Sequence, residues 1–138
     1  MLDLDYKVLK EIYHSPKSVK VSYIAKSLSI PHSTIGSCIK RLEEREYVLY
    51  DRYRLVMLSR KGENLAAELV RHARLLELLL YNELGLAPKD AHEESEKFNL
   101  LFSCKTINKI CEKYSHPKEC PCGEEISESL ECFCKKLI

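Results

Sequence analysis

The chain of 138 residues carries a formal net charge of +1 at pH 7, and 45% of its residues are hydrophobic. A chain of this length predicts one domain, or two small domains with a shared core. No apolar run approaches the length of a membrane span, and the N-terminal MLDLDYK lacks the basic and then apolar pattern of a signal peptide. We therefore expect a cytoplasmic protein that has no membrane partner.

The charged residues are distributed unevenly along the chain. Residues 1–62 contain 12 Lys and Arg against 7 Asp and Glu, a net charge of +5, whereas residues 63–138 contain 10 against 14, a net charge of −4. A basic excess confined to one part of a protein is typical of a surface that binds nucleic acid, because phosphates attract Lys and Arg. The first half of the chain is thus the part that we expect to contact DNA.

Apolar residues at helical spacing predict a first helix over 3–15 and a short second helix over 21–28. Pro31 separates the second helix from a third, because proline disfavours helical geometry at the residue before it. The third helix is predicted over about 33–46. Its apolar stripe consists of Ile35, Cys38, Ile39 and Leu42.

The last two of these helices and the segment after them have the pattern of a winged helix-turn-helix. The exposed face of the helix over 33–46 is small and polar at its start and basic further on. Such a face suits the major groove, where hydroxyls reach base edges and cations neutralise phosphates. Two β-like runs, 47–50 and 54–58, predict a wing; a helical hairpin without a DNA role is the alternative. The predicted contacts to double-stranded DNA are Ser33, Thr34 and Ser37 on base edges, and Lys40, Arg41, Arg52 and Arg54 on phosphates.

The second half of the chain is predicted to be helical. Ser59 has the properties of an N-cap for a long helix that runs to about 84, where Gly85 ends it. A second helix is expected over 88–102, with proline in its first turn, and a third over 103–114, with serine as its cap.

The predicted fold class is mainly α. It comprises a winged helix-turn-helix DNA-binding domain (1–62), an all-α dimerisation domain with a candidate metal site (63–115) and a small Cys-rich C-terminal segment (116–138). The apolar face of the long helix is wider than one neighbouring element needs. We therefore expect a two-fold homodimer whose interface is formed by residues after about 65.

Seven cysteines are informative in a protein expected in a reducing compartment, where clustered thiols more often bind metal than form disulfides. Cys120 and Cys122 are followed closely by Cys132 and Cys134, and four such thiols can hold one ion tetrahedrally. This pattern predicts a zinc or iron ion, an iron–sulfur cluster or a redox dithiol. Cys104, in the first turn of a predicted helix, is a further candidate for a ligand or a reactive thiol.

Four segments carry a resemblance to a known family, and they occur in the family's order. They are IAKSLSIPHSTIGSCIKRLEEREYVLYDRYR, LSRKGENLA, HARLLELLLYNELGLAPKDAHEESEKF and SHPKECPCG. With these segments the chain resembles the metal-dependent repressors of the diphtheria-toxin-repressor and manganese-transport-regulator type over about residues 4–123. The resemblance implies the short form of the family, without an SH3-like domain. It also implies homodimers that bind palindromic operators when loaded with Fe(II) or Mn(II).

The resemblance also assigns ligand positions. Glu77 and His92 fall on family ligands, and Glu96 takes the place of a Cys or Glu ligand. His72 lies one residue before a family His, and because it is five residues from Glu77 the two side chains are about 140° apart around the helix. The other family positions hold residues unsuited to Fe(II) or Mn(II), so we expect this site to bind either ion weakly. Those residues are Lys7, Ala73, Asn99 and Leu100.

The predicted function is transcription regulation by a homodimer on a palindromic operator, and not enzyme catalysis. The predicted effector is a metal ion, zinc or iron, or an iron–sulfur cluster on Cys120, Cys122, Cys132 and Cys134. One alternative is a DNA-binding regulator in which these cysteines hold structural zinc and the effector binds elsewhere. Another is a thiol redox protein, against which the lack of a thioredoxin-like βαβ pattern counts. A third is a protein–protein module whose winged helix no longer binds DNA.

Overall fold

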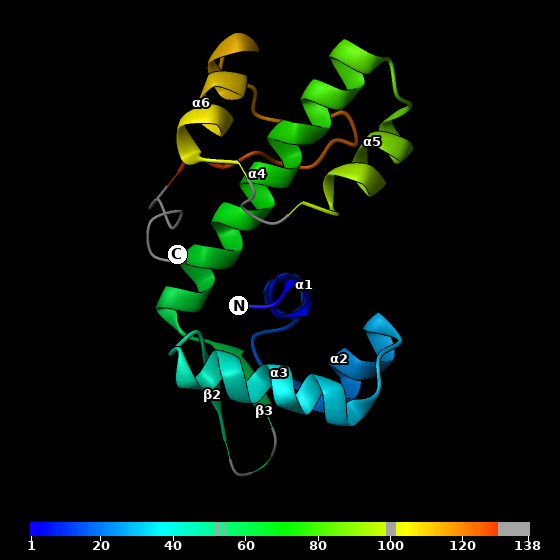
Figure 1. The fold of residues 1–138 in the computed structure, drawn as a ribbon. Helices are drawn as coiled ribbons and strands as arrows, with labels where there is room; N and C mark the ends of the chain where they lie inside the picture. The colour runs from blue at the N-terminus through cyan, green and yellow to red at the C-terminus, as the bar shows by residue number, and fades with distance from the viewer. Residues whose placement is uncertain (52, 54, 99–101, 130–138) are drawn as a thin grey trace. The chain divides into compact units, whose positions relative to one another are not determined.

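Figure 1 shows the computed structural model of the chain, which describes residues 1–51, 53, 55–98 and 102–129. The chain divides into two compact units, Met1–Ala66 and Ala67–Ile138. Helix α4 (Arg60–Leu84) begins in the first unit and continues in the second. In the described ranges, no helix combines the length and the apolar character that a membrane span requires.

The first unit combines helices with a small antiparallel sheet. The sheet order is β1-β3-β2, with Val19 of β1 and Tyr50 of β2 both opposite Val56 of β3. The β2–β3 hairpin is the predicted wing, whereas β1 was not predicted, because a strand of two residues is too short to show alternation. The elements are α1 (Asp3–Tyr13), β1 (Val19–Lys20), α2 (Val21–Leu28), α3 (His32–Glu44), β2 (Val48–Tyr50) and β3 (Leu55–Leu58).

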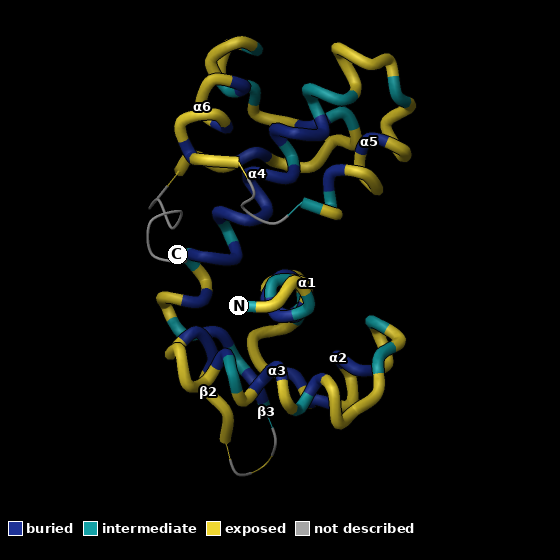
Figure 2. Tube along the Cα trace, in the orientation of Figure 1, coloured by how far each residue is buried: buried dark blue, intermediate teal, exposed yellow. Residues whose placement is uncertain are grey.

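Residues 29–31 form the turn between α2 and α3. Ser29 has a left-handed backbone (φ 55°), and the N–H of Ile30 bonds to the carbonyl oxygen of Ala25 at 3.0 Å, which ends α2. Pro31 is the N-cap residue of α3, so the predicted break is confirmed. Along α3 the buried and exposed residues alternate as an amphipathic helix requires (Figure 2). The winged helix-turn-helix is therefore present.

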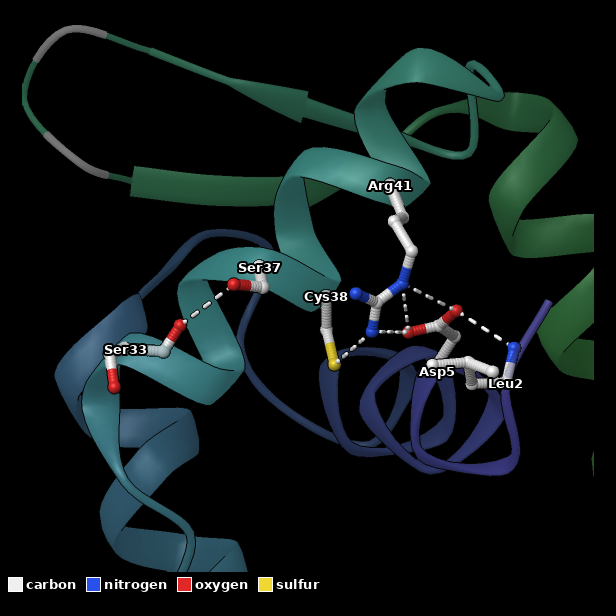
Figure 3. A network of polar contacts seen from close by, with 6 residues as sticks. All are labelled: Leu2, Asp5, Ser33, Ser37, Cys38 and Arg41. Carbon is white, nitrogen blue, oxygen red and sulfur yellow. Dashed lines mark hydrogen bonds and ion pairs between the residues drawn. The ribbon is translucent and has the colours of Figure 1, made fainter.

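A partly buried ion pair joins α1 to α3 (Figure 3). The Arg41 guanidinium donates to both oxygens of Asp5, with Nη2–Oδ1 at 2.8 Å and Nε–Oδ2 at 3.1 Å. The backbone N–H of Leu2 donates to the same carboxylate at 3.0 Å. Burial by itself raises the pKa of Asp5, but the bonds from Arg41 and Leu2 outweigh it and the pKa is lowered. Asp5 is therefore ionised and fixes one helix against the other.

The start of α4 is fixed against the wing. The Ser59 hydroxyl accepts a hydrogen bond from the N–H of Gly62 at 3.0 Å, which confirms the predicted N-cap. A Cβ at Gly62 would lie 1.9 Å from the carbonyl oxygen of Tyr47, so only glycine permits this approach. The helix therefore begins at a fixed distance from the residue that precedes β2.

The second unit packs α4 against α5 (Pro88–Ser95), α6 (Cys104–Lys113) and the segment after α6. Its core cluster includes Cys120 and Ile126, so residues of the Cys-rich segment contribute to the core. The cap of α6 is confirmed, because Ser103 accepts from the N–H of Thr106 at 3.2 Å. The other members of the core cluster are Leu75, Ile107 and Ile110.

Helix α5 is shorter than predicted, since it ends at Ser95 rather than near residue 102. The Ser95 hydroxyl donates to the carbonyl oxygen of His92 at 2.9 Å, and this local bond competes with the helical pattern. The N–H groups of Lys97 and Phe98 then bond three residues back, which tightens the chain into a turn. Apolar spacing alone gave no signal for this early end.

We expect Asp5→Asn to destabilise the first unit, because it leaves the Arg41 guanidinium without a counter-charge while it keeps the side-chain shape. Hydrogen bonds to charged groups contribute about 1.5–3 kcal/mol. The Arg41 side chain is 36% exposed and can regain water, so we expect a loss near the lower end of that range. Urea unfolding measures the difference. Asp3→Asn, which removes an exposed ion pair with Lys7, is the matched control and should change stability by less than about 0.5 kcal/mol.

The same pair predicts a pH dependence. The pKa of Asp5 in the folded state lies below its ordinary value of 3.8, so its ionised form contributes stability above that pH. This contribution is lost as the pH falls through the lowered pKa. The stability difference between the wild type and Asp5→Asn should therefore be largest near neutral pH and shrink below pH 3.8. A difference that stays constant with pH would contradict this role of Asp5.

Candidate metal centre and nucleic-acid interface

The exposed face of α3 is the candidate DNA-binding surface. Ser33, Thr34, Ser37 and Lys40 are all exposed, whereas the apolar stripe of the same helix is buried. The Ser37 hydroxyl donates to the carbonyl oxygen of Ser33 at 3.1 Å, which leaves its lone pairs on the outer face. Figure 3 shows both serines on the side of α3 away from Asp5.

Arg41 does not share this face, and its predicted contact with phosphate stays a prediction. Its guanidinium points toward α1, where it is held by the Asp5 carboxylate and lies 3.1 Å from the Cys38 sulfur (Figure 3). The sequence gave no sign of this pairing, because Asp5 and Arg41 are far apart in the chain. The positive charge of Arg41 is thus paired with the Asp5 carboxylate within the first unit.

The wing is turned by a side chain that the sequence analysis did not select. Asp51 Oδ1 accepts hydrogen bonds from the N–H groups of Tyr53 at 2.8 Å and Leu55 at 3.0 Å. An aspartate that bonds to the backbone two residues further on is a common turn former. Arg52 and Arg54, the predicted phosphate contacts of the wing, lie outside the described residues.

In the second unit, Glu77 of α4 is the centre of a cluster of metal-ligand side chains. Its Oε1 lies 3.2 Å from His92 Nδ1 on α5 and accepts a hydrogen bond from the Cys122 thiol, with Sγ–Oε1 at 3.0 Å. Glu77 is 0% exposed, and its Oε2 finds no hydrogen-bond partner in the described part of the chain. A buried carboxylate with an unpaired oxygen is unfavourable unless a cation meets it. The cluster therefore fits a divalent ion.

The environment of Glu77 keeps the neighbouring thiols protonated. The hydrogen bond to Glu77, burial and the charge of that carboxylate raise the pKa of Cys122 to about 12. Burial, followed by the hydrogen bond to Glu77, raises the pKa of Cys120. Redox-active thiols need a lowered pKa, so this setting argues against the thiol redox alternative. A bound cation would replace the thiol proton, since metals bind the thiolate.

The structure thus joins two ligand sets that were predicted separately. Glu77 and His92 come from the family positions, and Cys122 comes from the spacing of the cysteines. Glu96 is the C-cap of α5 and is not among the described side chains that converge on Glu77. The two predicted ligands Cys132 and Cys134 lie outside the described residues.

The structure describes two of the four family ligand positions that hold an unsuitable residue in this chain. Lys7 forms an exposed ion pair with Asp3, with Nζ–Oδ2 at 3.6 Å, and Ala73 is a buried apolar residue of α4. Neither of them offers a donor atom to a cation. Asn99 and Leu100 lie outside the described residues.

His72 and Cys104 lie in a different cluster. His72 does not share a face with Glu77, as the five-residue spacing predicts, and its Nε2 lies 3.9 Å from Cys104 Sγ. The third member is Glu68, one helical turn before His72, with Oε1–Nε2 at 3.3 Å. The sequence analysis missed Glu68, although its i,i+4 spacing to His72 was a signal that could have found it.

The fold and the Glu77 cluster define a class of winged-helix protein with a helical metal-binding unit. A sequence model described as "Iron dependent repressor, metal binding and dimerisation domain" matches residues 59–128. The chain belongs to this family, the metal-dependent repressors of the diphtheria-toxin-repressor and manganese-transport-regulator type. Members of the family are transcriptional repressors and not enzymes.

Individual relatives agree with this assignment. The chain is 30% identical over 91 residues to the HTH-type transcriptional regulator MntR of Geobacillus kaustophilus (strain HTA426), which covers 66% of this chain and 64% of that protein. It is 30% identical over 112 residues to the MntR of Lysinibacillus sphaericus (strain C3-41), and this match covers 81% of this chain and 78% of that protein. The structure of the manganese regulator SloR superposes with a TM-score of 0.81 at 27% identity, over 93% of this chain and 61% of that chain. The chain thus spans less than two thirds of the Geobacillus regulator and of SloR.

Cys122→Ser tests the Glu77 cluster. Because a thiolate is a stronger ligand for Zn(II) than a hydroxyl, we expect this variant to bind Zn(II) at least about tenfold more weakly, as loss of a mere supporting group already costs that much. Competition with a chromophoric chelator measures the affinity. Glu119→Gln, an exposed change three residues away on the same loop, is the control and should leave the affinity unchanged. Equal affinities of Cys122→Ser and the wild type would exclude the thiol as a ligand.

Proposed function

We propose that this chain is a metal-responsive repressor that binds double-stranded operator DNA as a homodimer, with a divalent cation at Glu77, His92 and Cys122 as its effector. The observation that carries the proposal is the fully buried Glu77 carboxylate, which faces an imidazole and a thiol and keeps one oxygen unpaired among the described residues. Membership of a repressor family supplies the link from this cation site to DNA.

The donor set favours a borderline metal over a hard one. A carboxylate, an imidazole and a thiol together suit Zn(II) or Fe(II), whereas Mn(II) prefers oxygen ligands. Glu77 also raises the pKa of Cys120, but the Cys120 sulfur is not among the described donor atoms that converge with Glu77, His92 and Cys122. An iron–sulfur cluster needs thiolates on nearly every iron position, and the described cluster offers a carboxylate and an imidazole instead. Participation of Cys132 and Cys134 stays a prediction.

A cation at Glu77 would act by fixing neighbouring elements to α4. Its ligands come from α4, α5 and the loop after α6, and the Cys122 thiol also donates to the carbonyl oxygen of Pro88 at 3.4 Å. The loaded site would hold α5 and this loop in one arrangement. Because α4 is continuous from the first unit into the second, a change in the second unit has a covalent path toward the winged helix.

Exposed apolar side chains support the proposed dimer. Tyr81 is 42% exposed and Leu84 is 67% exposed at the end of α4. Residues 78–80 just before them are half-buried, so this end of α4 presents apolar surface to solvent. Such surface is commonly covered by a partner in soluble proteins. Sedimentation at micromolar concentration should show a dimer, and a monomer would remove the palindromic operator from the proposal.

DNA binding should depend on the cation. We expect the full chain to bind a duplex selected from random sequences more tightly with Zn(II) than with a chelator present, since the family resemblance implies binding in the loaded state. Fluorescence anisotropy measures the two affinities. Glu77→Gln/His92→Gln should remove the difference. If the wild type binds DNA equally with and without metal, the effector role of this site is wrong.

Two substitutions on α3 separate phosphate contacts from base readout. Lys40→Ala should weaken binding to all duplexes and reduce the slope of log affinity against log salt by about 0.9 per lost phosphate contact. Ser37→Ala should instead lower the preference for the selected duplex, by roughly 1 kcal/mol, with the salt slope unchanged. Lys105→Ala, an exposed change on α6, is the charge-matched control. If both α3 variants bind like the wild type, α3 is not the recognition helix.

A further inference from the structure

A second cluster of metal-ligand side chains lies on another face of α4. Glu68 and His72 stand one turn apart on α4, and Cys104 is the first residue of α6. These side chains are 2%, 4% and 9% exposed. One donor atom from each lies within 4.8 Å of the other two. Two helices thus bring a carboxylate, an imidazole and a thiol to one buried point.

The distances in this cluster match the edges of a metal coordination polyhedron. A tetrahedral Zn(II) ion with bonds of about 2.0 Å to nitrogen and about 2.3 Å to sulfur places those two ligand atoms about 3.5 Å apart. The observed His72 Nε2–Cys104 Sγ distance is 3.9 Å, and His72 Nε2–Glu68 Oε1 is 3.3 Å. Only small movements of these side chains are needed to admit an ion.

The protein's own groups leave the cluster incompletely paired. His72 Nδ1 and Arg71 Nη1 are buried, and neither finds a hydrogen-bond partner within the described residues. Arg71 is nearest to Glu68 at 4.0 Å, and its Nε instead donates to the carbonyl oxygen of Ser127 at 3.1 Å. Glu68 Oε1 accepts from the Ser129 hydroxyl at 2.9 Å. Both nitrogens would donate to an acceptor such as water, so the cation site is argued from the convergence of Glu68, His72 Nε2 and Cys104 and not from these two atoms.

Cys104 is the first residue of α6, so a bond from a metal ion to its sulfur would hold the start of this helix against α4. The donor set of the cluster is one carboxylate, one imidazole and one sulfur. The guanidinium of Arg71 lies 4.0 Å from Glu68 Oε1, and its Nε donates to the carbonyl oxygen of Ser127.

We propose that Glu68, His72 and Cys104 form a second divalent-cation site, selective for thiophilic ions of the Zn(II) type, which fastens α6 to α4. The fourth ligand is water or the Ser129 hydroxyl. This site is separate from the Glu77 cluster and shares no ligand with it, because His72 and Glu77 are about 140° apart around α4. It does not depend on the proposed effector role of Glu77.

The test uses the full chain in a Glu77→Gln/Cys122→Ser background, which disables the first cluster. Zn(II) binding is titrated without oxygen against a chromophoric chelator, and Co(II) is the spectroscopic probe. Cys104→Ser and Glu68→Gln are each added to this background. Cys111→Ser is the matched control, because it lies on the same helix and outside the cluster. Circular dichroism of the metal-free proteins checks that each variant is folded.

We expect Cys104→Ser and Glu68→Gln each to bind one Zn(II) fewer per chain than the background protein. Cys104→Ser should also lose thiolate-to-Co(II) charge-transfer absorption, which Cys111→Ser should retain. If Cys104→Ser fails to fold, the nearly isosteric Glu68→Gln decides. Equal Zn(II) binding by the background and the folded variants would overturn the second site and leave the Glu77 proposal intact. If, as single changes in the wild-type chain, Cys104→Ser loses an ion and Cys122→Ser does not, the second site stands and the Glu77 proposal is wrong.

Discussion

The burial of negative charge on helices is the constraint on which this structure depends. Asp5 and Glu77 are both 0% exposed, and an unpaired buried carboxylate would cost several kcal/mol. Asp5 has a permanent counter-charge in Arg41, whose guanidinium is always protonated. Among the described residues, Glu77 meets the imidazole of His92 and the thiol of Cys122, and its Oε2 has no hydrogen-bond partner there. The first carboxylate thus has a fixed counter-charge, whereas under the proposed function a bound cation supplies it for the second.

The two carboxylates therefore differ in what holds their neighbouring elements together. The Asp5–Arg41 pair holds α1 against α3 without any ligand. Around Glu77, the hydrogen bond to that carboxylate, burial and the charge of the carboxylate raise the pKa of the Cys122 thiol to about 12. Under the proposed function, the metal and the proton compete for the same sulfur.

The sequence predicted features that depend on neighbours in the chain. The turn at Pro31, the caps at Ser59 and Ser103 and the apolar stripe of α3 all follow from local backbone chemistry, and the structure confirms them. The early end of α5 escaped prediction because apolar spacing does not show local bonds such as that from the Ser95 hydroxyl to the carbonyl oxygen of His92. Pairing across the chain also escaped it: no local pattern shows that Arg41 will meet Asp5.

The candidate metal residues illustrate the same limit. Helical spacing correctly separated His72 from Glu77, because angles around a helix are fixed by sequence distance. It did not show that Cys122, from a loop far along the chain, would meet Glu77 and His92. Glu68 was missed because an acidic residue beside arginines on a helix usually forms a solvent-exposed ion pair. Its burial is a property of the packed unit and not of the local sequence.

Under the two proposals, the clusters on α4 would couple metal binding to the folding of the second unit. Each joins α4 to different partners: the Glu77 cluster to α5 and the loop after α6, and the Glu68 cluster to α6 itself. A ligand that binds only the folded state stabilises it in proportion to the logarithm of its concentration. Two sites without a common ligand atom can therefore stabilise their own elements separately and communicate only through α4. Under the two proposals, the Glu68 site would set whether α6 is in place, and the Glu77 site would set whether the rest of the unit closes around it.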